Sequence, residues 1–262
     1  MASPLTVWST TADGRVVGGV DATYANCRRF STSASNSGTT GSIAGQNTGY
    51  ACYEGFVSFD TSTVGSGSTV TVATLSFYGS LDRSAVDFIL QARFYDWGAS
   101  LTVDDWASGD PTDAGSLDEY TLLAAYDTAS GWPETSAYVA LVSEAAFLSN
   151  IAKTGTTYVM TSSSRQLNGD VPTGTEYVQA YLADDATGGG GTDRDPKLYV
   201  EWTEGGSVPT LAATKTVTEI AATTATSGGT LTANNGTLTA YGVCWNKTGT
   251  PVVGGSHTTD GP

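Results

Sequence analysis

The chain is poor in the residues that most catalytic and nucleic-acid-binding sites require. It has one histidine, three cysteines and 11 lysines and arginines in 262 residues, against 26 aspartates and glutamates. Phosphate backbones are bound by clustered lysine and arginine, so the net charge of −15 argues against a nucleic-acid partner. The single histidine, His257, lies far along the chain from any matched nucleophile, and it makes a poor set of zinc ligands with three scattered cysteines. We therefore predict no catalytic residues and no enzymatic activity.

Long hydrophobic runs are also absent. No apolar stretch approaches the roughly 18 to 20 residues that a membrane-spanning helix needs, so we expect no membrane insertion. The first residues, MASPLTVWSTTADG, lack the basic start and apolar stretch of a secretory signal. Three cysteines are too few for a disulfide framework, but Cys27 and Cys52 are a candidate pair, whereas Cys244 is expected to be a buried thiol.

What the chain has in quantity is typical of β-strands and turns. It contains 32 glycines and 13 tyrosines, and only 14% of its residues are charged. Apolar and polar residues alternate over residues 53–60, and similar strand patterns follow at 69–78, 88–95, 157–162, 176–182 and 197–202. Helical signals are few and short, at 100–108 and 143–151. The sequence predicts an all-β fold, in which a jelly-roll β-sandwich is followed by a partial immunoglobulin-like β-sandwich.

Charge and composition divide the chain into two domains. After Gly205 the only charged side chains are Lys215, Glu219, Lys247 and Asp260, which cancel, so the whole net charge falls on the first 204 residues. We predict an acidic jelly-roll domain at 1–204, a linker at 205–209 and a partial immunoglobulin or fibronectin-like domain at 210–262. About 55 residues stand where such a sandwich needs roughly 90 to 100. We expect either a longer polypeptide or a strand from another copy to supply the missing pairing.

Tryptophan and aspartate supply the candidate ligand-binding residues. Sugar rings stack their C–H faces on exposed aromatic rings, and Trp97, Trp106 and Trp132 are the candidates for such a platform; the alternative is that each packs in the core or in a loop. Calcium prefers oxygen ligands, and Asp184, Asp185, Asp193 and Asp195 flank one glycine-rich loop. The alternative there is a turn whose aspartates pair with a nearby arginine. No other cofactor is expected.

Several segments also resemble known modules. The series YEGFVSFDTSTV, TVATLSFYGS, DFILQARFYDWG and TDRDPKLYVEW resembles a jelly-roll module of carbohydrate-binding-module type, found in phage virion and bacterial surface proteins. The stretches TEIAATTATSGGTLT and YGVCWNKTGTP resemble the immunoglobulin or fibronectin type III-like repeats of bacterial surface proteins. The resemblance implies display or assembly outside the cell, in a filament, at a cell surface or on a virion.

Two functions follow as hypotheses. The first is a non-enzymatic structural subunit of an extracellular filament or virion appendage, a head-to-tail homopolymer that assembles through β-strand complementation. The uncharged N-terminal segment around Leu5 and Val7 is the candidate assembly strand, and the alternative is that it forms the first strand of its own jelly roll. The second is a carbohydrate-binding or adhesion module that recognises surface glycans.

Overall fold

The computed structural model describes residues 2–19, 23–35, 39–134, 137–183, 194–205, 210–233, 242–246, 248, 250 and 256–258. The chain divides into two compact units, a larger one of Met1–Ser66 and Val70–Thr203 and a smaller one of Gly67–Thr69 and Glu204–Pro262. Strands dominate the described residues and the helices are short, so the predicted all-β fold is confirmed.

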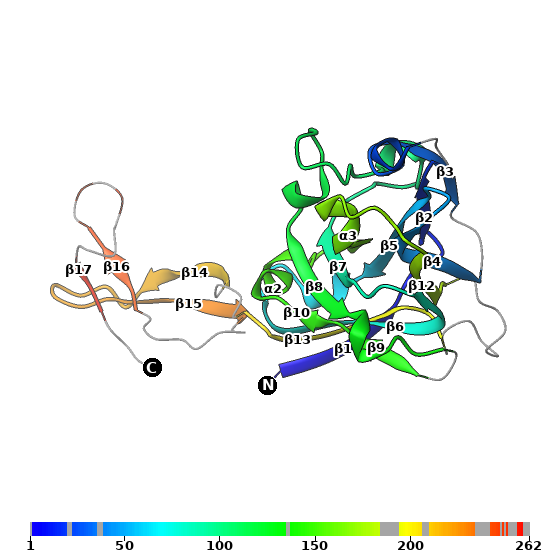
Figure 1. Ribbon diagram of the computed structural model, residues 1–262. Coiled ribbons are helices and arrows are strands. Elements are labelled where there is room, and N and C mark those ends of the chain that lie inside the picture. The colour runs from blue at the N-terminus through cyan, green and yellow to red at the C-terminus, as the bar shows by residue number, and fades with distance from the viewer. Residues whose placement is uncertain are drawn as a thin grey trace. The chain divides into compact units, whose positions relative to one another are not determined.

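The larger unit is built on one curled antiparallel sheet (Figure 1). Short strands lie beside its main path: β2 (Gly14–Gly18) pairs with β3 (Ser31–Ser35) and β5 (Cys52–Asp60), and β9 (Tyr138–Ala140) pairs with β6 (Thr69–Ser84). A jelly roll of two separate sheets stays a prediction. The path runs in the order β1 (Ala2–Trp8), β13 (Lys197–Thr203), β6 (Thr69–Ser84), β12 (Thr175–Tyr181), β4 (Thr40–Asn47), β5 (Cys52–Asp60), β11 (Thr156–Ser163), β7 (Ile89–Phe94), β8 (Leu122–Asp127) and β10 (Val142–Ser143).

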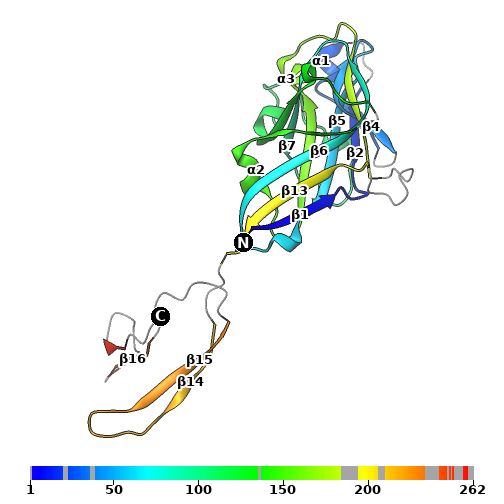
Figure 2. The ribbon, with the colours of Figure 1, turned by 90° about the horizontal axis from the view of Figure 1, so that it is seen from below.

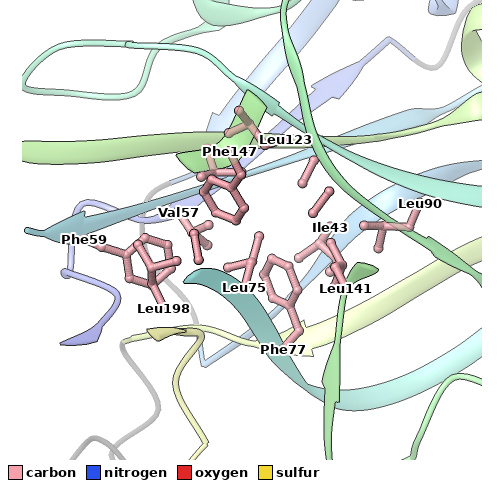
Figure 3. Close-up of a cluster of buried hydrophobic side chains, with 14 of the residues drawn as sticks. Ile43, Val57, Phe59, Leu75, Phe77, Leu90, Leu123, Leu141, Phe147 and Leu198 are labelled. Carbon is pink, nitrogen blue, oxygen red and sulfur yellow. The ribbon is translucent and has the colours of Figure 1, made fainter. Parts of the chain in front are cut away.

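Side chains from many of these strands meet in one main core. Figure 3 shows that residues distant in sequence, such as Phe59 of β5 and Leu198 of β13, point toward one another. Phe147 of helix α2 (Ala145–Asn150) closes the same cluster, and none of its side chain is exposed. The curl of the sheet lets one sheet enclose a core, because strands far apart along its path face each other across these side chains.

Both faces of the central strand β5 are buried. Val57 and Phe59 point into the main core. On the opposite face Glu54, Phe56 and Ser58 are also buried. Phe56 belongs to a second cluster with Val16, Trp97, Leu101, Ala107, Leu117 and Met160. A second layer of loops therefore covers this part of the sheet.

The short helices of the larger unit connect strands. The helical signals at 143–151 and 100–108 correspond to α2 and to the 3₁₀ helix η2 (Val103–Asp105). Two other α-helices, α1 (Tyr24–Cys27) and α3 (Ser164–Asn168), lie near each other in Figure 2. None of the helices in the described residues is long and apolar enough to cross a membrane. The remaining 3₁₀ helices are η1 (Ser62–Val64), η3 (Leu117–Glu119) and η4 (Thr128–Ser130).

A buried polar network joins α3 to the sheet. The Arg165 Nε of α3 donates to the Glu176 Oε2 of β12 at 2.9 Å, and no part of the Glu176 side chain is exposed. Gln46 Nε2 donates to the same oxygen at 2.9 Å, and the Thr173 amide donates to Oε1 at 2.8 Å. Burial alone raises the pKa of Glu176, but these hydrogen bonds and the Arg165 charge outweigh it and lower the pKa below its ordinary value.

The smaller unit contains two short antiparallel pairs in its described residues. Strand β14 (Thr210–Thr218) pairs with β15 (Thr226–Ala233), and β16 (Cys244–Trp245) pairs with β17 (Ser256–His257). Residues 214–230 are exposed, except for Gly228, which is half-buried. Cys244 is half-buried rather than fully buried. The immunoglobulin-like arrangement of this unit stays a prediction.

Candidate functional site

A cleft of about 470 Å³ opens on the larger unit, above the second core cluster. Three segments form it: the residues after α1, the residue after β7, and the stretch that runs from η2 to the residue after η3. Four of its lining side chains are aromatic, and three are charged. The lining residues are Arg29, Phe30, Tyr95, Asp104, Trp106, Ser108, Asp113, Ala114, Gly115 and Tyr120.

The first wall follows directly from α1. The Arg28 guanidinium donates to the carbonyl oxygens of Gln166 and Leu167 at 3.0 and 2.9 Å, and also to that of Gly109. The next residue, Arg29, pairs with Asp113, with Nε donating to Oδ2 at 2.8 Å. Phe30 then projects with 59% of its surface exposed. Two consecutive arginines thus tie this wall to α3 and to the opposite loop.

The second wall is a loop that holds its own shape through short polar contacts. Thr102 caps η2 while the Asp105 side chain accepts from the Thr102 amide at 2.7 Å, a reciprocal capping box. Ser108 Oγ donates to Asp113 Oδ2 at 2.7 Å. The Arg29 hydrogen bond, together with that of Ser108, lowers the pKa of Asp113, so this carboxylate stays ionised at neutral pH.

Packed aromatic rings support the floor of the cleft. Tyr95 and Tyr120 meet edge to face, with ring centroids 4.9 Å apart. Below them Phe56 packs edge to face against Tyr95 and Trp97, with ring centroids 5.9 and 5.4 Å apart. Such contacts fix ring orientation, because the positive edge of one ring lies on the negative face of the next. The aromatic part of the cleft is therefore held by the core beneath it.

Under this floor lies an acidic side chain that is completely buried, Glu54. Its Oε2 accepts from the Ala107 amide at 3.1 Å, and its Oε1 accepts from Gln166 Nε2 at 3.0 Å. Burial raises the pKa of Glu54 well above its ordinary value, and these two hydrogen bonds offset only part of the rise. Glu54 thereby anchors the backbone beside Trp106 to β5 and α3.

A scan against protein-family models and a search of the curated proteins found no match for this chain.

Of the three predicted platform tryptophans, only Trp106 lines the cleft. Trp97 and Trp132 are 6% and 4% exposed, so both rings are almost completely covered. Trp97 packs on Phe56, and Trp132 Nε1 donates to the Gln179 carbonyl at 2.8 Å. The two side chains follow the alternative prediction of core packing, because an indole that closes a strand is a large core filler.

The sequence did not identify Arg29, Phe30, Tyr95, Asp113 or Tyr120 as cleft residues. Arg29 and Phe30 follow a four-residue helix whose brevity leaves no periodic signal. Tyr95 and Tyr120 occupy strand and turn ends, where tyrosine is common for packing reasons alone. The signal that was present is the Arg-Arg-Phe run in a chain with very few basic residues.

The calcium site stays a prediction, because the structure describes only one of its four proposed ligands. Asp184, Asp185 and Asp193 lie outside the described residues. Asp195 is 4% exposed, and its backbone carbonyl accepts from the Tyr138 hydroxyl at 2.9 Å. Among the described residues, no three histidine, cysteine, aspartate or glutamate side chains gather to hold a metal ion.

The structure does bring the predicted cysteine pair together. The sulfur atoms of Cys27 and Cys52 lie 2.8 Å apart as free thiols, and both side chains are fully buried.

The candidate assembly strand lies in β1 and pairs within its own chain. Leu5 stands opposite Val200 and Val7 opposite Leu198 in the antiparallel register with β13. Both side chains are partly buried against the main core. In this structure the segment acts as the first strand of its own sheet, because its alternating apolar residues complete the core at that edge.

Proposed function

We propose that the larger unit is a non-enzymatic carbohydrate-binding module that works outside the cell, and that its cleft binds the glycan. The observation that carries this proposal is the combination of exposed aromatic surface, from Phe30 and Trp106, with a fixed Arg29–Asp113 pair in one cleft. A sugar presents apolar C–H faces and a ring of hydroxyl groups. Aromatic faces with a few oriented polar groups match both features.

The polar groups favour a neutral sugar. Arg29 donates Nε–H and one terminal N–H to Asp113, which leaves further guanidinium donors for hydroxyl oxygens. Asp104 is exposed at the rim and provides acceptors for hydroxyl protons. Two carboxylates and one guanidinium leave the lining with a net negative charge, which disfavours uronic acids.

The volume of the cleft lies within the range of roughly 300–1,000 Å³ for small-molecule pockets, so we expect a short oligosaccharide or the end of a longer chain.

The experiment is a glycan array with the unmodified protein, followed by titration of the best ligand. Phe30→Ala is expected to weaken binding about tenfold or more, because an exposed aromatic ring that stacks on a ligand contributes much of the affinity of a small interface. Val142→Ala is the control, since Val142 is 72% exposed on β10 and does not line the cleft. If the unmodified protein binds no glycan, or if Phe30→Ala binds as well as the control, the proposal is wrong.

A specific observation also supports the second hypothesis, a filament subunit. Strand β1 ends the sheet path and has β13 as its one partner among the described strands, and it carries no charged residue. Uncharged edge strands pair with further strands. On this hypothesis, light scattering shows association that rises with concentration, and Thr6→Lys at the exposed position on β1 reduces it. The control variant Ser100→Lys, at an exposed position outside β1, leaves association intact. A monomer at all concentrations would exclude assembly through β1.

A further inference from the structure

Two buried thiols meet at the base of the cleft wall. Cys27 is the last residue of α1, and Cys52 is the first residue of β5. Neither side chain has exposed surface, and their sulfur atoms lie 2.8 Å apart. The pair joins a short helix to the central strand of the sheet.

The absence of a side chain at Gly18 lets the end of α1, with Cys27, approach the sheet near Cys52. Gly18 stands opposite Cys52 in the pairing of β2 with β5. A Cβ at Gly18 would lie 2.0 Å from the Cys27 carbonyl oxygen and 2.7 Å from the Trp106 ring. Both groups therefore rest on the bare backbone of Gly18. The thiol pair and the Trp106 ring of the cleft share one support.

The chain runs from Cys27 directly into the cleft wall. Arg28, Arg29 and Phe30 follow it without an intervening element. Helix α1 is four residues long, so its own hydrogen bonds do little to fix its position. Its remaining attachments to the sheet include the Tyr24 hydroxyl, which donates to Gln46. A covalent bond at Cys27 would restrict the position of everything that follows it.

We propose that Cys27 and Cys52 form a disulfide bond and that this bond fixes the cleft wall in the geometry that binds ligand. The two thiols lose two protons and two electrons to a disulfide oxidant such as oxidised glutathione, which is reduced to two thiols. The effect on ligand affinity rests on the proposed carbohydrate-binding function, whereas the bond itself does not. With both sulfurs buried, reduction of the bond requires local opening of the fold.

The gain in affinity comes from preorganisation. When a binding surface is already ordered, less conformational entropy is lost on binding.

Burial raises the pKa of the Cys52 thiol well above its ordinary value, so thiolate is scarce in the folded protein. The bond therefore forms fastest while the chain folds, before these sulfurs are buried.

The test uses the full chain with Cys244→Ser, which leaves only the two thiols of interest. The protein is refolded with oxidised and reduced glutathione, then denatured, alkylated and weighed by mass spectrometry. We expect no free thiol after refolding with oxidised glutathione and two after reduction. We also expect amide hydrogen exchange over residues 24–30 to be about tenfold slower in the oxidised form, and affinity for the glycan found on the array to be about threefold to tenfold higher.

A second variant keeps the test independent of folding problems. Cys52→Ala also removes the bond, so oxidant should change neither its exchange rates nor its affinity. Two free thiols after oxidative refolding would overturn the proposal, as would a bond that forms without changing exchange over 24–30. Slower exchange in the oxidised protein, with no glycan bound by either form, would refute the proposed function and leave the positioning role supported.

Discussion

Replacing Phe56 with alanine is expected to lower the free energy of unfolding of the larger unit by about 3 to 5 kcal/mol. The Phe56 side chain has no exposed surface and joins the rings of Tyr95 and Trp97 edge to face. The change loses the transfer free energy of a phenyl ring and leaves a cavity on the face of β5 that the cleft loops cover. Chemical denaturation monitored by near-ultraviolet circular dichroism measures the change.

The matched control is Phe30→Ala, which removes the same atoms from a side chain that is 59% exposed. We expect a much smaller change in the free energy of unfolding for Phe30→Ala, while ligand binding weakens about tenfold or more. Phe56→Ala should weaken binding only indirectly, through the support of Tyr95. Equal destabilisation by the two changes would contradict the assignment of Phe56 to the core and Phe30 to the cleft.

Arg165→Met is expected to lower the free energy of unfolding by about 2 to 3 kcal/mol at neutral pH. The change leaves the Glu176 carboxylate buried without its guanidinium partner, although Gln46 and the Thr173 amide still donate to it. Because 18% of the Arg165 side chain is exposed, the loss falls below that of a fully buried pair. Urea denaturation of both proteins gives the difference.

The pH dependence of the difference in free energy of unfolding between the unmodified protein and Arg165→Met identifies the cause of that difference. In the folded protein the pKa of Glu176 lies below its ordinary value of 4.5. The ionised carboxylate therefore contributes stability above pH 4.5, and the contribution is lost as the pH falls through the lower, folded pKa. The difference between the two proteins should shrink over the same range. Arg29→Met, which breaks a more exposed pair, should have a small effect at neutral pH. A constant difference from pH 7 to the acid range would point to lost packing instead.

The strands that the sequence located best are those with one buried face. In β13, Leu198, Val200 and Trp202 are buried, while the residues between them are partly or fully exposed. A period of two follows directly from that geometry. The same period gives no information on whether the second face of β5 is covered, and there loops distant in sequence bury Glu54 and Phe56. Local periodicity carries no information about a covering layer from elsewhere in the chain.

The cleft was less predictable than the sheet for the same reason. The pairing of Arg29 with Asp113 joins residues 84 positions apart, and neither belongs to a periodic pattern. Composition could identify tryptophan as a candidate ligand-binding residue, but it could not separate Trp106 from Trp97. Their difference lies in what packs on each ring: Phe56 and Tyr158 meet Trp97 edge to face, whereas Trp106 lies against Gly18 and the cleft.

The most direct test of the proposal that the cleft binds a glycan is nuclear magnetic resonance titration of the isotope-labelled chain with the best array ligand. The six tryptophans provide indole signals that variants can assign. We expect the Trp106 indole and the amides of residues 29–30, 104–108 and 113–115 to shift with ligand, while the Trp97 and Trp132 indoles shift much less. Shifts centred on another surface, or none at saturating ligand, would contradict the account.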